Sequence, residues 1–215
     1  MRRDVLWLLV AMANAAVFIA ADSGGLPEPL RWVAKPAATL ALIAWAWPRG
    51  ASQPAQRQWL RLGLFASLAG DVALLWPAQG FLPGLLGFLV AHLAFVRSMT
   101  TRSRLAHPGW PWAVYGALAA LVLSAWIWPG LPAALRAPVL VYVAVLVAMA
   151  GQGASWWWAS RQREAGWAAL GGALFLASDT LLAVDRFGGG VPAASLFVHA
   201  LYWGSIALIG RSLPR

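Results

Sequence analysis

The chain has 215 residues, of which 61% are hydrophobic and 11% charged, and its mean hydropathy is +0.68. This composition excludes an ordinary water-soluble globular domain. A transmembrane helix needs about 20 residues, so eight crossings use about 160 residues and leave only short loops. Because the chain has no cysteine, thiolate chemistry, disulfides and Cys-ligated metal sites are excluded.

Apolar runs follow one another along the whole chain and predict an all-α polytopic membrane protein with a single integral membrane domain over residues 1–215. The first run follows Met1-Arg2-Arg3 as a signal peptide would, but its length and its poor cleavage site favour a retained helix. The eight predicted transmembrane helices cover roughly residues 4–21, 31–48, 59–77, 81–99, 110–128, 137–158, 165–184 and 192–211.

The basic residues stand in short clusters between the apolar runs, which argues against a nucleic-acid partner. With a cytoplasmic N-terminus, 12 of the 16 Lys and Arg residues fall on the inner side. The positive-inside rule therefore predicts that both termini are cytoplasmic, and we expect the bacterial inner membrane as the location. Most of the 15 tryptophans lie near the ends of the runs and are interpreted as interfacial anchors, whereas Trp203 lies inside a run and is a candidate pocket residue.

Ionisable side chains inside apolar runs indicate function, because each costs several kcal/mol unless it is paired or hydrated. Asp71 and His92 lie in successive runs, and Asp179 and His199 repeat this arrangement. Both aspartates are expected about 8–9 Å below the outer ends of their helices, which places a cavity mouth on the outer side. The structural alternatives are carboxylates that fix helix packing, satisfied core histidines, and a Lys35 side chain that extends to the interface.

The two halves of the chain show a weak internal similarity. Aligning Asp71 with Asp179 brings His92 close to His199 in the helices that follow. One interpretation is a parallel 4+4 repeat with the site between the halves, and the other is chance similarity of helices rich in Ala and Leu. A metal site built from the Asp and His residues is a further alternative, although no tight ligand spacing supports it.

The same residues resemble the YhhN family of integral membrane proteins over nearly the whole chain. The likeness includes Lys35-Pro36, Ser67-Leu68-Ala69-Gly70-Asp71 with Leu74, Gly84-x-x-x-Phe88-x-x-x-His92, Pro138-Val139-x-x-Tyr142 with Met149, Gly172-Ala173 with Phe175 and Ser178-Asp179, and Tyr202-Trp203. Phe95 and Ser205 depart from the family pattern, where a tyrosine and a glutamine are expected.

The resemblance implies a lysoplasmalogenase-like hydrolase that cleaves the vinyl ether bond of a lysophospholipid to a fatty aldehyde and a glycerophospho-ethanolamine or -choline. It implies catalytic roles for Asp71, Asp179 and His92, and no metal or organic cofactor. One aspartate is expected to be protonated and the other ionised. Substrate-binding roles are expected for Lys35, His199, Tyr202, Ser178 and Phe88. The alternatives are a proton-coupled transporter or lipid-binding protein that uses the same groups, and a structural role as helix contacts; the oligomeric state stays open.

Overall fold

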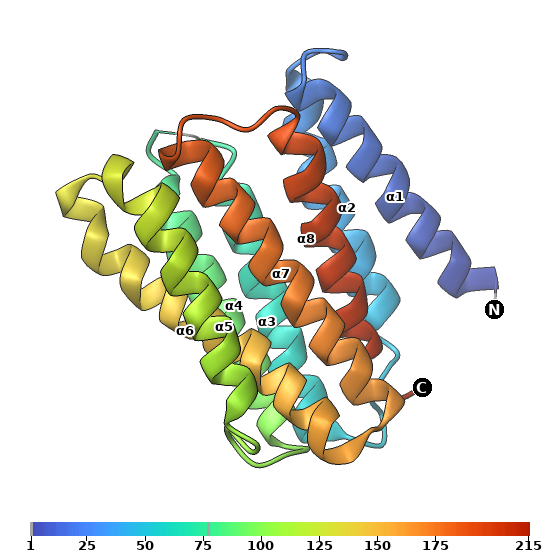
Figure 1. Cartoon of the computed structure of the whole chain (residues 1–215). Coiled ribbons are helices and arrows are strands. Elements are labelled where there is room, and N and C mark those ends of the chain that lie inside the picture. The colour runs from blue at the N-terminus through green and yellow to red at the C-terminus, as the bar shows by residue number, and fades with distance from the viewer. Residues whose placement is uncertain (1, 77) are drawn as a thin grey trace.

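The computed structural model describes residues 2–76 and 78–215, and within them all regular structure is helical (Figure 1). Met1, Pro77 and the side chains of Arg2 and Arg3 lie outside the described residues, so the inner-side charge predicted for those two arginines is not covered. The α-helices are α1 (Arg2–Asp22), α2 (Pro29–Ala46), α3 (Pro54–Ala73), α4 (Phe81–Thr100), α5 (Trp110–Val122), α6 (Ala133–Ser160), α7 (Arg163–Phe187) and α8 (Ala194–Arg211). A π-helical turn, Leu123–Ile127, and a 3₁₀ turn, Trp128–Gly130, continue α5.

Five of these helical segments are long and apolar enough to cross a membrane. They are Asp4–Asp22, Phe81–Thr100, Trp110–Gly130, Ala133–Ser160 and Arg163–Phe187. The predicted all-helical integral membrane architecture is therefore confirmed at this level. The remaining helices α2, α3 and α8 have 18, 20 and 18 residues, and they carry several of the polar side chains discussed below.

Two helix boundaries differ from the sequence prediction in ways that matter for the site. Helix α3 begins at Pro54, where a proline loses no hydrogen bond, and it ends at Ala73 rather than near residue 77. Asp71 consequently lies in the last turn of α3, about 3 Å from its end, instead of 8–9 Å. Helix α6 begins at Ala133, four residues before the predicted start, so Pro138 lies inside the helix.

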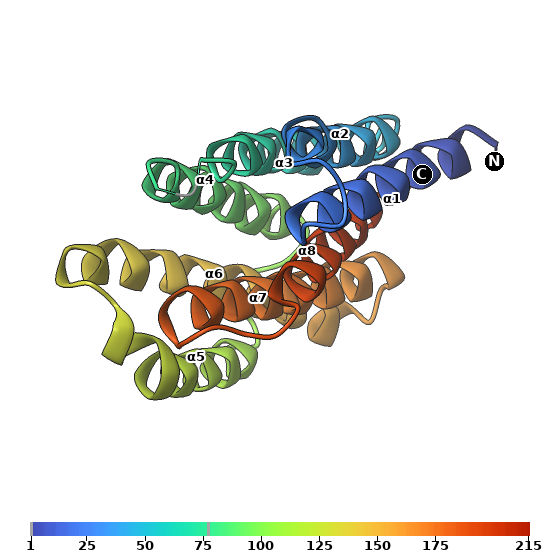
Figure 2. The ribbon, with the colours of Figure 1, turned by 90° about the horizontal axis from the view of Figure 1, so that it is seen from above.

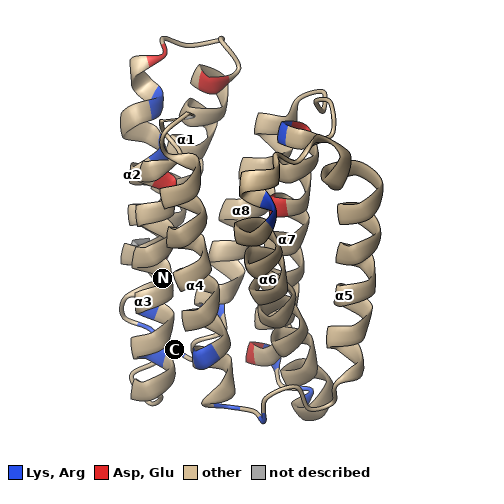
Figure 3. Ribbon diagram, turned by 90° about the vertical axis from the view of Figure 1, so that its left-hand side faces the viewer, with Lys and Arg blue, Asp and Glu red and all other residues tan. Residues whose placement is uncertain are grey.

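Helices α1–α4 lie on one side of the bundle and α5–α8 on the other (Figure 3), and Figure 2 shows α2–α4 and α5–α7 as two layers with α8 between them. Contacts of α8 with α1 and α2, and of α4 with α6, join the two sides. Glycine allows the closest approaches: a Cβ at Gly87 would lie 2.8 Å from the backbone nitrogen of Gly70, and one at Gly171 would lie 3.0 Å from that of Ile209. The first of these contacts fixes α4 against α3 one residue before Asp71.

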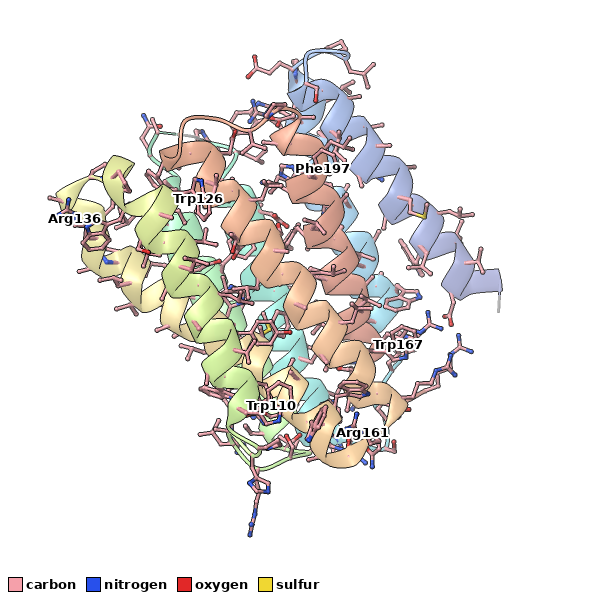
Figure 4. All side chains as sticks on the ribbon, viewed as in Figure 1. Trp110, Trp126, Arg136, Arg161, Trp167 and Phe197 are labelled. Atoms are coloured by element: carbon pink, nitrogen blue, oxygen red, sulfur yellow. The ribbon has the colours of Figure 1, made fainter. Side chains whose placement is uncertain are left out.

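Both chain ends lie at the same end of the bundle, where Arg215 Nη2 is 3.1 Å from Asp4 Oδ2. Among the predicted tryptophan anchors, Trp47, Trp157 and Trp158 are exposed, as expected for interfacial residues. Trp45 and Trp156 are instead buried in the protein core, so the anchor interpretation was wrong for them. In Figure 4, Trp110 and Arg161 lie toward one end of the bundle, and Trp126 and Arg136 lie toward the other.

Candidate active site

Asp71 lies at the centre of a polar cluster formed by α2, α3 and α8. Its side chain is 1% exposed, and its Oδ2 accepts hydrogen bonds of 2.6 Å from Thr39 Oγ1 and 2.6 Å from Tyr202 Oη. Lys35 Nζ lies 3.9 Å from Oδ1, and Trp203 Nε1 donates to Thr39 Oγ1 at 3.0 Å. A helix C-terminus carries partial negative charge, so a carboxylate in the last turn of α3 needs such donors and the nearby cation.

Asp179 lies at the centre of a second cluster, formed by α4, α6 and α7. Tyr142 Oη donates a short hydrogen bond to Asp179 Oδ2. His92 Nε2 lies 3.0 Å from Tyr142 Oη and 3.6 Å from Asp179 Oδ2. Because the Tyr142 hydroxyl proton is donated to Asp179, the Tyr142 oxygen can accept a hydrogen bond from His92 Nε2–H. His92 Nδ1 is buried and, among the described residues, has no hydrogen-bond partner, which suits an acceptor better than a donor.

The two aspartates line one polar pocket. Its wall also contains Lys35, the ring of His199 and, near the ends of α1, α2 and α7, three charged side chains: Asp22, Arg31 and Arg186. Arg31 pairs with Asp22 at 3.2 Å. The structure thus brings both predicted carboxylates and Lys35 to a common cavity with a charged rim.

An apolar pocket adjoins the polar one between α4, α5, α6 and α7. Tyr142, Asp179 and Arg186 are its main polar members, and the rest of the wall comes from aliphatic and phenylalanine side chains. Residues on the boundary line both pockets: Leu74, Phe81, Phe88, Asp179, Leu182 and Arg186. Asp179 therefore borders a polar and an apolar compartment at once, whereas Asp71 lines only the polar one.

Of the other predicted site residues, some line the pockets and one is buried behind them. Phe88 lies on the boundary, with its ring centroid 5.6 Å from that of Tyr202. His199 and Ser178 line the polar pocket, but His199 Nδ1 is 2.8 Å from the Ser195 carbonyl and Ser178 Oγ donates to the Val198 carbonyl at 2.8 Å. His92 is fully buried and reaches the pockets only through Tyr142 and Asp179.

Sequence reasoning assigned no role to Thr39, Tyr142, Arg31 or Arg186. Arg186 lines both pockets, with its guanidinium 4.2 Å from the centre of the Phe81 ring. Thr39 could have been found from its spacing, because it lies one helical turn after Lys35 and shares its face. Arg31 and Arg186 gave no such signal, since residues at helix ends are usually hydrated.

A metal-binding group is absent from the part of the chain that the structure describes: no three His, Asp or Glu side chains in it could hold an ion together. The polar network instead consists of paired carboxylates, hydroxyls, one ammonium and imidazole. Such a set can bind, protonate and deprotonate an organic substrate.

The fold and the pockets define an integral membrane protein with a buried carboxylate, Asp71, in a polar pocket and a part-buried one, Asp179, where this pocket meets an apolar one. The profile of the YhhN family matches residues 30–213, so the chain belongs to the YhhN family. It is 33% identical over 164 residues to "Lysoplasmalogenase TMEM86A" of Bos taurus, with 70% of this chain and 63% of that protein covered. It is 32% identical over 195 residues to "Lysoplasmalogenase" of Mycobacterium tuberculosis, with 83% and 69% covered. For "Lysoplasmalogenase TMEM86B" of Homo sapiens the identity is 31% over 167 residues, with 74% and 64% covered.

The chain thus spans somewhat less than two thirds of the length of the mammalian relatives named above and slightly more of the mycobacterial one. No solved structure matches this chain.

Proposed function

We propose that this protein hydrolyses the vinyl ether bond of lysoplasmalogens, the activity for which its curated relatives are named. The observation that carries the proposal is the position of Asp179, which borders a polar and an apolar pocket at the same point. A lysoplasmalogen changes from a charged head group to a long hydrocarbon chain at its vinyl ether. The bond that breaks would therefore lie beside the carboxyl group that borders both chambers.

The substrate fits the two pockets in one orientation. The head-group phosphate would bind near Arg31, Lys35 and Arg186, while the alkenyl chain would lie among the apolar side chains of α4–α7. Ionic contacts in a poorly hydrated chamber are stronger than the same contacts in water. The charged rim would fix the head group, and the apolar pocket would set the depth of the reacting bond.

The two carboxylates would have different protonation states. Asp71 is ionised because Lys35 lies beside it and two hydroxyls donate to it. Asp179 has no Lys or Arg salt-bridge partner among the ion pairs of the described residues, and Tyr142 and His92 both approach its Oδ2. We propose that the proton used in the reaction is carried on Asp179 Oδ1, the oxygen that neither Tyr142 nor His92 approaches.

The reaction follows from these states. Asp179 gives its proton to the β-carbon of the vinyl ether, and the resulting oxocarbenium ion is stabilised by the Asp71 carboxylate in the same chamber. Water adds to the cationic carbon and loses a proton to the enzyme, which restores the acid. The hemiacetal hydroxyl then loses its proton as the C–O bond to the glycerol breaks and the glycerol oxygen gains a proton. The products are a fatty aldehyde and the glycerophospho head group. His92 and Tyr142 hold the Asp179 carboxyl group in place.

We further propose that all eight helices span the membrane, with both termini on the cytoplasmic side, in a bacterial inner membrane. Helices α2, α3 and α8 are long enough to cross. Site residues lower the hydropathy of α2 and α8, whereas in α3 Asp71 adds to the effect of the Gln and Arg residues near its start. The eight helices would constitute one integral membrane domain. Ten arginines of the described side chains lie at the helix ends and loops on the side of the chain termini, in keeping with the positive-inside rule.

The contacts of the two aspartates also support a parallel 4+4 repeat. Asp71 is contacted from α2 and α8, and Asp179 is contacted from α6 and α4. In such a repeat α2 corresponds to α6 and α4 corresponds to α8. Each carboxylate thus receives one partner from its own half and one from the other half, as expected for a site between related halves.

The experiment is an aldehyde-release assay on the purified protein in detergent, without any ion gradient. The substrates are 1-alkenyl-lysophosphatidylethanolamine and the saturated 1-alkyl and 1-acyl analogues. We expect aldehyde from the alkenyl lipid alone, because protonation at carbon requires the double bond. In D₂O, with the product reduced at once to the alcohol, one deuterium should appear at the carbon next to the former aldehyde. Release of fatty acid instead, or a requirement for a gradient across vesicles, would contradict the proposal and favour an acyl hydrolase or a transporter respectively.

A further inference from the structure

A basic pocket lies at the opposite end of the bundle from the charged rim of the active site. Four guanidinium groups from four segments of the chain line it: Arg49 before α3, Arg163 in α7, Arg211 in α8 and Arg215 at the end of the described chain. Arg31 at the rim and Arg49 in this pocket are 18 residues apart along and just beyond α2, which corresponds to about 27 Å. The basic pocket is therefore separate from the proposed catalytic chamber.

The pocket is held in a fixed shape by buried contacts. The Gly50 nitrogen donates to the Pro214 carbonyl at 2.7 Å, and Leu213 is 1% exposed, so the segment after α8 is packed against the α2–α3 connection. Arg49 is 7% exposed, and its Nε, among the described atoms, is buried without a hydrogen-bond partner. Arginines whose only role is to fix the orientation of the helices in the membrane do not need to be buried in this way.

The positive charge of the pocket exceeds the negative charge beside it. Asp4 pairs with Arg49 at 3.6 Å and with Arg215 at 3.1 Å, and Glu164 is the acidic residue in the wall. Two carboxylates thus face four guanidiniums. Exposed Arg163 and Arg211 supply the excess, and both are suited to bidentate contacts with a phosphate.

Trp167 lines the basic pocket, and tryptophans near helix ends are typical of the membrane surface. The guanidiniums of Arg211 and Arg163 lie 4.7 Å and 5.7 Å from the centre of its ring. Figure 4 shows Trp167 near the end of the bundle where the chain termini lie. Leu213 and Pro214 add apolar surface to the wall of the basic pocket itself. A ligand with a phosphate and hydrocarbon chains matches both features.

We infer that this pocket binds the phosphate of an anionic phospholipid, of the phosphatidylglycerol type, from the leaflet on the side of the chain termini. The phosphate would lie between Arg163 and Arg211 over Trp167, with Arg49 beneath it, and the acyl chains would lie along α7. Because α7 also carries Asp179, an occupied pocket would stabilise the helix that positions the proposed acid. This inference concerns lipid binding and stands whether or not the proposed hydrolysis is correct.

The test uses the full-length protein in phosphatidylcholine-doped detergent micelles, with phosphatidylglycerol or inorganic phosphate added. Bound lipid is counted by native mass spectrometry, and the unfolding temperature is followed in parallel. Phosphatidylglycerol should bind and raise the unfolding temperature, and inorganic phosphate should not. The double variant Arg163→Gln/Arg211→Gln should bind about 25-fold more weakly, since each basic residue near a membrane surface contributes about fivefold.

Arg136→Gln is the matched control, because Arg136 lies over Trp128 at 4.8 Å at the other end of the bundle. It should bind phosphatidylglycerol as the wild type does. If the double variant does not fold in phosphatidylcholine alone, the single variant Arg211→Gln should still show a loss of about fivefold. The inference is overturned by equal binding of the two lipids, by unchanged binding in the arginine variants, by an equal loss in Arg136→Gln, or by an equal response to inorganic phosphate.

Discussion

The two aspartate clusters use the same residue type in opposite environments. Asp71 has an ammonium group 3.9 Å away and two hydroxyl donors, and it is 1% exposed. Asp179 has a tyrosine donor and an imidazole nitrogen 3.6 Å away, and its side chain is 13% exposed. The first cluster compensates a negative charge, and the second leaves a carboxyl group at the boundary of two pockets without a basic Lys or Arg in its salt-bridge pairs.

We therefore expect the two aspartates to have different roles. A carboxylate that is paired with a buried cation contributes to stability and to the local field, so its removal should affect folding as well as chemistry. A carboxyl group without that pairing can exchange its proton with a substrate at little structural cost. The predictions below separate these two roles, beginning with the largest effect.

Replacing Asp179 should abolish the chemistry and spare the fold. Asp179→Asn keeps the shape of the side chain but cannot act as an acid, so aldehyde release should fall by about 10²–10⁴-fold. Its unfolding temperature should stay near that of the wild type, because the substitution strands no Lys or Arg from the described ion pairs. The control is Asp185→Asn, which is on the same helix and whose carboxylate accepts from the Val191 nitrogen at 2.8 Å. Near-normal aldehyde release by Asp179→Asn contradicts the assignment.

Replacing Asp71 should reduce both activity and stability. Asp71→Asn leaves Lys35 buried without its counter-ion, which costs about 3–5 kcal/mol when a buried pair is broken on one side. The double variant Lys35→Met/Asp71→Leu removes both charges and should recover most of the unfolding temperature while it remains inactive. Thermal unfolding in detergent measures both. A single variant that is as stable as the wild type would show that Lys35 and Asp71 do not form a charged pair.

The tyrosines that donate to the two aspartates form a matched pair. Tyr142→Phe removes the hydroxyl that donates to Asp179, and kcat should drop about tenfold, which corresponds to about 1.4 kcal/mol. Tyr202→Phe should cost less, since Asp71 keeps Thr39 and Lys35. The KM should change little in either variant. A larger loss in Tyr202→Phe than in Tyr142→Phe would reverse the assigned roles.

The smallest effect should appear in the apolar pocket. Ala119 lines it, so Ala119→Phe should fill part of the space for the alkenyl chain and raise the KM a few-fold for long chains but not for short ones. Ala120→Phe is the control, because its side chain is exposed and lies outside the pocket wall. The measurement is the KM of each variant, from initial rates with substrates of different alkenyl chain lengths. Equal effects of the two substitutions would contradict the proposal that the alkenyl chain of the substrate binds in this pocket.

Much of the fold follows from the sequence because a membrane imposes a simple pattern. Apolar runs of about 20 residues with basic residues between them predict helices in order, and the described helices agree with that order. The end of α3 was harder to predict, because Val72, Leu74 and Leu75 continue the apolar run after Asp71 although the helix stops at Ala73. Hydropathy does not distinguish a helical leucine from one in a turn.

The only rule that predicted site residues from the sequence was that a charged residue inside an apolar run indicates function. That rule identified Lys35, Asp71 and Asp179, which the structure brings to one pocket. It could not identify Tyr142, because a tyrosine in an apolar helix packs in many cores without touching a carboxylate. The pairing of α2 and α8 with Asp71, and of α4 and α6 with Asp179, depends on contacts far apart in the chain, and a single sequence does not encode them visibly.

The most direct test of the account is infrared spectroscopy of the purified protein near neutral pH, which detects the carbonyl stretch of a protonated carboxyl group. The account predicts this band in the wild type and in Asp71→Asn, and its loss in Asp179→Asn. A band that disappears in Asp71→Asn and persists in Asp179→Asn would contradict the division between the two clusters.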